Sequence, residues 1–216
     1  MIPLYIASLC TSLVVYMPHR SWYDALTIPV SLYMADFISG CVHILLDHGS
    51  CGTLTPFVTN PSIHELAMVR TLYPVVYHTS SVFQRMCFEF QKHHQFPSHI
   101  VRKSMVEVST TIVSFTWMLQ CLLLMCFYSN VVSSRFFFVA STVTLCGSVS
   151  QLTHQSAHDI ECQSLFVYYL RKSRLIITPE HHHIHHQTYD SHFPILSGWS
   201  TPLLNQISPY VLQNSK

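Results

Sequence analysis

The feature that most constrains the fold of this chain is a series of apolar stretches, each about as long as a membrane-spanning helix. A helix needs about 20 mostly apolar residues to cross the hydrocarbon core of a bilayer. Charged residues make up only 10% of the chain, well below the roughly 25% of an average soluble domain. The sequence therefore predicts an all-α integral membrane protein with about four transmembrane helices, at approximately residues 2–17, 27–46, 110–128 and 136–152.

The lysines and arginines are unevenly distributed among the connections between these stretches. Five lie in residues 47–109 and four beyond residue 153, whereas the two short connections carry one each. Because Lys and Arg accumulate in cytosolic loops, we expect both termini and the central segment to be cytosolic. The expected membrane is the endoplasmic reticulum, since residues 2–17 do not have the Ser- and Arg-rich composition of a plastid transit peptide. The net charge of +1 gives no indication of nucleic-acid binding.

The run His181-His182-His183-Ile184-His185-His186 is the clearest sign of chemistry in the chain. On a helix, His181 and His185 would share one face, with His182 and His186 beside them. Crowded imidazoles disfavour one another's protonation, whereas neutral imidazole is a good ligand for Fe, Zn, Cu or Ni. The run therefore indicates a metal site, the alternative being a His-rich surface tract.

Other potential ligands recur at helical or adjacent spacing, as His43 with Asp47, His93 with His94, and His154 with His158. The charge distribution assigns all of them to the same side of the membrane. Ionisable groups at membrane boundaries are costly and are functional candidates for that reason.

Nine imidazoles exceed what one metal ion needs, and two irons with open positions account for the number. Iron with oxygen also attacks C–H bonds in ways that zinc does not. Asp47 is either a ligand or the acceptor that fixes an imidazole tautomer, whereas Asp36, inside the second stretch, is expected to satisfy a polar partner within the bundle. The predicted metal ligands and catalytic residues are His43, Asp47, His93, His94, His154, His158, His181, His182, His185 and His186.

Four stretches together resemble the plasmanylethanolamine desaturase (Kua) family, which includes the plant fatty acid desaturase 4 type. They are Ala35 to His43 with Asp47, Gln91 to Pro97, His154 to His158, and Pro179 to His186 running on to Ser197-Gly198-Trp199. The resemblance spans about residues 30–207 and implies one membrane-embedded lipid desaturase domain over residues 1–216, with a His-rich C-terminal region at 154–200.

The resemblance implies a di-iron enzyme that uses O2 and electrons, from a donor such as cytochrome b5, to remove two hydrogens from a membrane phospholipid chain. In animal and bacterial members, the product is the vinyl ether of a plasmalogen. Desaturation of an acyl chain and hydroxylation are alternatives. A metal-binding homologue with impaired catalysis is another, because Lys103-Ser104 and Ser109 stand where family members usually carry His-Asp and Asn.

Overall fold

The computed structural model describes residues 24–58, 69, 71, 73–161 and 164–213. In these residues the regular elements are all helices, which agrees with the all-α prediction. The elements are α2 (Asp24–His48), η2 (Gly52–Leu54), α3 (Thr55–Val58), α5 (Pro74–Thr79), α6 (Val82–Gln95), η3 (Pro97–His99), α7 (Met105–Tyr128), α8 (Ser134–His158), α9 (Leu165–Lys172), α10 (Pro179–Thr188) and α11 (Thr201–Gln213).

Two of these helices are long and apolar enough to cross a membrane, Leu26–His48 in α2 and Ser134–His158 in α8. They correspond to the expected spans at 27–46 and 136–152. The expected span at 110–128 lies in α7, whose apolar part, Ile112–Tyr128, is shorter. The expected span at 2–17 lies outside the described residues. The structure therefore supports two spans rather than confirming four.

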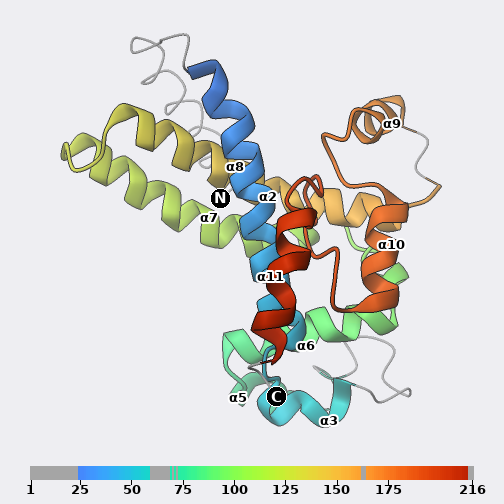
Figure 1. The fold of residues 1–216 in the computed structure, drawn as a ribbon. Helices are drawn as coiled ribbons and strands as arrows, with labels where there is room; N and C mark the ends of the chain where they lie inside the picture. Colours follow the sequence, from blue (N-terminus) through green and yellow to red (C-terminus); the bar gives the residue numbers. More distant parts are fainter. Residues whose placement is uncertain (1–23, 59–68, 70, 72, 162–163, 214–216) are drawn as a thin grey trace.

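The three long helices pack together and direct large apolar side chains outward. In Figure 1, α7 and α8 form an antiparallel pair that α2 crosses, and α11 lies along α2. Met118 and Met125 on α7 are 70% and 62% exposed, and Leu45 on α2 is 56% exposed. Such surfaces are stable against lipid chains, where exposing a Met or Leu carries no hydrophobic cost. This surface and the two candidate spans support a membrane protein.

Local sequence signals explain where the helices that carry the site begin. Ser81 and Ser104 each form a capping box with the residue three positions later, so that α6 and α7 start at Val82 and Met105. Thr178 caps α10 and is followed by Pro179, which suits the first helical position because its missing N–H has no intrahelical partner.

The carboxylate of Asp36 ties the middle of α2 to the C-terminal segment. It is fully buried and accepts hydrogen bonds from the backbone N–H groups of Ser197, Gly198 and Ser200, at 2.7, 3.0 and 2.8 Å. The hydroxyl of Ser200 adds a fourth bond at 2.7 Å. A buried carboxylate requires such donors, and the sequence prediction that Asp36 has a polar partner within the bundle is confirmed.

Candidate metal centre

Two groups of potential metal ligands meet where the ends of α2, α6 and α8 approach α10 (Figure 1). In each group, one ligand atom from every residue lies within 4.8 Å of those of the others. The groups are adjacent, since the rings of His94 and His186, one from each group, have centroids 4.6 Å apart. The five-histidine group consists of His93, His154, His158, His182 and His186, and the Asp47 group consists of His43, Asp47, His94 and His185.

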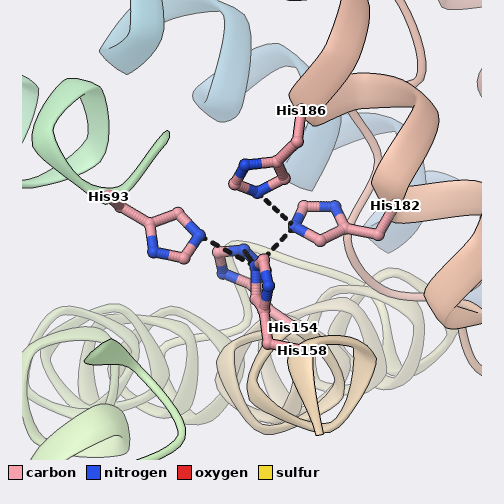
Figure 2. A group of neighbouring side chains, drawn as sticks. All are labelled: His93, His154, His158, His182 and His186. Carbon is pink, nitrogen blue, oxygen red and sulfur yellow. Dashed lines mark hydrogen bonds between the residues drawn. The ribbon is translucent and has the colours of Figure 1, made fainter. Parts of the chain in front are cut away.

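Figure 2 shows the five-histidine group, to which α6 contributes His93 and both α8 and α10 contribute a pair four residues apart. The Nε2 atom of His158 lies 2.9 Å from Nε2 of His93, 2.9 Å from that of His182 and 3.3 Å from that of His154. Nε2 of His186 lies 3.1 Å from that of His182. The ring nitrogens thus converge on one small volume.

Hydrogen bonding alone does not account for these contacts. A neutral ring nitrogen carries either one proton or one lone pair, so Nε2 of His158 cannot bond to all three of its neighbours. Metal–imidazole bonds are about 2 Å long, which places neighbouring nitrogens around one ion about 3 Å apart. The observed spacing of 2.9–3.3 Å fits this arrangement. The five-histidine group therefore suits a shared cation.

The Asp47 group also suits a shared cation, but for a different reason. Nδ1 of His43 lies 2.8 Å from the carbonyl of Phe193, and Nδ1 of His185 lies 2.8 Å from that of Ser191. In each ring Nδ1 must donate, because a carbonyl only accepts, so in a neutral ring Nε2 keeps its lone pair. Those Nε2 atoms face Oδ2 of Asp47 at 3.2 and 3.1 Å, without hydrogen-bond geometry.

Lone pairs of nitrogen and of a carboxylate repel when they face each other in a buried site, unless a cation lies between them. Asp47 is only 4% exposed, and Nε2 of His94 approaches its other oxygen at 3.0 Å. The two backbone carbonyls hold the rings of His43 and His185 with Nε2 toward the carboxylate, as outer partners of metal-bound imidazoles commonly do. Both groups therefore fit a metal ion.

Three histidines of the ligand groups that lie outside the candidate spans, His93, His182 and His186, are held neutral. Burial lowers the pKa of His93 and of His182 well below its ordinary value, and neighbouring imidazoles lower it further. The pKa of His186 is lowered to about 2 by burial and then by His94 and His158. Neutral imidazole is the form that binds metal ions.

The structure brings together nine of the ten predicted ligands and leaves out His181. Its Nε2 lies 3.0 Å from the hydroxyl of Thr201, and its ring lies against that of His192 at 4.8 Å. Successive helical residues point about 100° apart, so directing His182, His185 and His186 toward the bundle turns His181 toward the loop before α11. The prediction that His181 is a metal ligand is therefore not supported, whereas His185 lies in the Asp47 group.

A family model described as lipid desaturase domain matches residues 76–212, more than half of the chain. The chain belongs to this lipid desaturase domain family. No curated protein and no solved structure matches it. The matched range contains seven of the nine clustered ligands, whereas His43 and Asp47 lie before it on α2. Two of the four residues of the Asp47 group, His43 and Asp47, therefore come from outside the part of the chain that matches the lipid desaturase domain.

The sequence positions that depart from the expected family pattern lie outside both ligand groups of the desaturase domain. Ser104 caps α7, and the hydroxyl of Ser109 donates to the carbonyl of Met105. Lys103 precedes α7, and the amide of Gln155 on α8 donates to its carbonyl at 2.8 Å. Neither ligand group depends on these three side chains.

An apolar cavity of about 180 Å³ reaches the five-histidine group between α2, α6, α7 and α8, and His93 and His154 form part of its wall. A second cavity, of about 190 Å³, reaches the Asp47 group and is lined mainly by polar side chains. Neither cavity could be predicted from the sequence, nor could the role of the carbonyls of Ser191 and Phe193, because tertiary packing sets the positions of voids and backbone groups. The apolar part of the first cavity includes Val42, Leu46, Phe90, Ile112 and Phe115.

Proposed function

We propose that this protein is a di-iron lipid desaturase that introduces a double bond into a glycerophospholipid chain in the membrane. The observation that carries the proposal is the juxtaposition of two adjacent ligand groups with an apolar cavity. The lipid desaturase domain supports the reaction class. The choice of the ether-linked chain of a plasmanyl lipid, with a plasmalogen vinyl ether as product, rests on the sequence resemblance.

The proposed reaction, rather than the ligand set, favours iron over zinc. The two groups offer eight imidazoles and one carboxylate, a donor set that suits Fe, Zn or Cu. Iron bound there supplies the activation of O2 and the oxidation of C–H bonds, whereas zinc has no redox chemistry. His93, His154, His158, His182 and His186 would hold one ion, and His43, Asp47, His94 and His185 would hold the other.

The protein's own contribution is to position the chain and exclude water. The first cavity has an apolar wall formed by residues such as Val42, Phe90 and Ile112, which suits a hydrocarbon chain. Because His93 and His154 form part of the same wall, a chain in this cavity lies beside the five-histidine group. Holding the reacting carbons there and keeping water out lowers the entropic and solvation costs of the reaction.

The cellular setting follows from the same proposal. The substrate is a membrane phospholipid, the electrons come from a donor such as cytochrome b5, and the protein resides in the endoplasmic reticulum with both termini cytosolic. The polar ligand groups lie at the ends of α2 and α8, the two candidate spans, which suits a centre at one membrane boundary.

The test is expression in cells that make plasmanyl lipids but lack plasmalogens, with lipid analysis by mass spectrometry. We expect vinyl-ether lipids with the wild-type protein and none with His154→Ala. A new double bond in acyl chains, or a product that retains oxygen, would replace the proposed reaction with acyl desaturation or hydroxylation. A protein that holds iron but changes no lipid would contradict the enzymatic proposal and favour the impaired metal-binding homologue.

A further inference from the structure

The two ligand groups are reached from different cavities. The apolar cavity meets the five-histidine group at His93 and His154, between helices that include both candidate spans. The second cavity meets the Asp47 group at Asp47 and His94, and its wall includes Gln91, Gln95 and Tyr189. If the apolar cavity holds a lipid chain, the Asp47 group can still be reached through the second cavity.

Tyr189 occupies a position where its own backbone is unfavourable. It caps α10 with φ 60° and ψ −6°, the left-handed conformation that glycine adopts most readily and that bulky residues avoid. Its N–H donates to the carbonyl of His185, and its carbonyl accepts from Nε2 of His48 at 3.2 Å. Such a conformation costs backbone energy, so the surrounding contacts must hold Tyr189 in place.

The side chain of Tyr189 connects a predicted ligand with the protein surface. Its ring lies against that of His94, with centroids 4.6 Å apart and planes inclined by 39°. At the same time Tyr189 is 45% exposed, whereas His94 itself is buried at 7%. The phenol ring is thus an aromatic contact between the outside and the Asp47 group.

The proposed reaction needs electrons from outside the site. When the two hydrogens leave the chain as part of water, O2 takes up two electrons from the chain and two more, with two protons, from outside, and the products are one C=C bond and two waters. The outside electrons come one at a time from a redox protein that does not enter the site. Electron transfer weakens steeply with distance, so a ring that spans from surface to ligand shortens the gap.

We propose that Tyr189 is the residue through which electrons from the donor protein reach the metal centre. This inference rests on the proposed function. Tyr189 acts through the ring of His94, and is therefore a positioning residue for electron entry rather than a metal ligand.

The test compares three replacements at residue 189. Tyr189→Phe keeps the ring, Tyr189→Leu keeps bulk over His94 without aromaticity, and Tyr189→Gly removes both while suiting the backbone. The matched control is Gln187→Ala, an exposed position on the same helix. The readouts are iron content, the rate at which dithionite reduces the iron of purified protein, lipid product in cells, and the oxidation state of iron in isolated membranes by Mössbauer spectroscopy.

We expect all variants to bind iron and react with dithionite like the wild type. In cells, product from Tyr189→Leu and Tyr189→Gly falls on the order of tenfold, about 1.4 kcal/mol in barrier, and their iron stays oxidised. Tyr189→Phe and Gln187→Ala match the wild type.

Full product from Tyr189→Leu would show that covering His94 suffices, and loss of iron in either non-aromatic variant would show that the ring holds the site together. Either result overturns the inference while leaving the proposed function standing. Absence of product from the wild-type protein, with iron bound and reducible, would instead refute the proposed function itself.

Discussion

Replacing Asp36 tests how the C-terminal segment is held against α2. In Asp36→Ala, three backbone N–H groups and the hydroxyl of Ser200 lose their acceptor. A buried donor left unpaired costs about 1–3 kcal/mol. Since Ser197 and Gly198 are only partly buried and gain some hydration, the total destabilisation should be about 3–5 kcal/mol.

The effect should reach the metal centre, because the same segment carries the carbonyl of Phe193 that orients His43. For a chain of this size, about 3–5 kcal/mol corresponds to a fall of about 6–20 °C in melting temperature. We expect Asp36→Asn, which keeps one acceptor oxygen, to fall between Asp36→Ala and the wild type. Iron content should fall in the same order.

The assay is thermal unfolding of the purified protein in detergent, with iron measured on the same samples. Ser39→Ala is the matched control, since its hydroxyl is on the same helix and makes only a weak contact with the segment, at 3.5 Å from the N–H of Ile195. Its melting temperature should change little. If Asp36→Ala and Ser39→Ala behaved alike, the carboxylate would not anchor the segment, and the reasoning from buried hydrogen bonds would be wrong.

Three further predictions concern the histidines. His182→Ala should lose at least half of the bound iron, measured by elemental analysis, whereas His183→Ala on the exposed side of α10 should keep it; equal retention would contradict the ligand assignment. The His181→Ala variant should also keep its iron, because in the wild-type protein the ring of His181 bonds to Thr201 and not to a metal ion. Loss of iron from this variant would show that His181 is a ligand after all. Because burial lowers the pKa of His182 below its ordinary 6.5, the unfolded chain binds a proton that the folded, iron-free protein excludes. Below about pH 6.5, His182 should therefore lower the free energy of unfolding of the iron-free protein by about 1.4 kcal/mol for each pH unit. Denaturant titrations between pH 7 and pH 5 measure this fall. If they showed none, the ring of His182 would not be buried.

The sequence by itself determined the kinds of ligand and the local pairs. Spacing of four residues places His154 with His158, and His182 with His186, because a helix repeats every 3.6 residues. The low charge content and the apolar stretches likewise determined an all-helical membrane protein, since only a helix or a closed barrel satisfies the backbone in lipid. These features depend on neighbouring residues alone.

Only the tertiary structure decided which ligands belong to the five-histidine group and which to the Asp47 group. His93 and His94 are adjacent in sequence, yet they belong to different groups, as do His185 and His186. Consecutive helical side chains diverge by about 100°, and packing determines which group each one meets. The tautomer of His43 is likewise fixed by the carbonyl of Phe193, 150 residues away, a contact between backbone and side chain that leaves no trace in residue type or spacing.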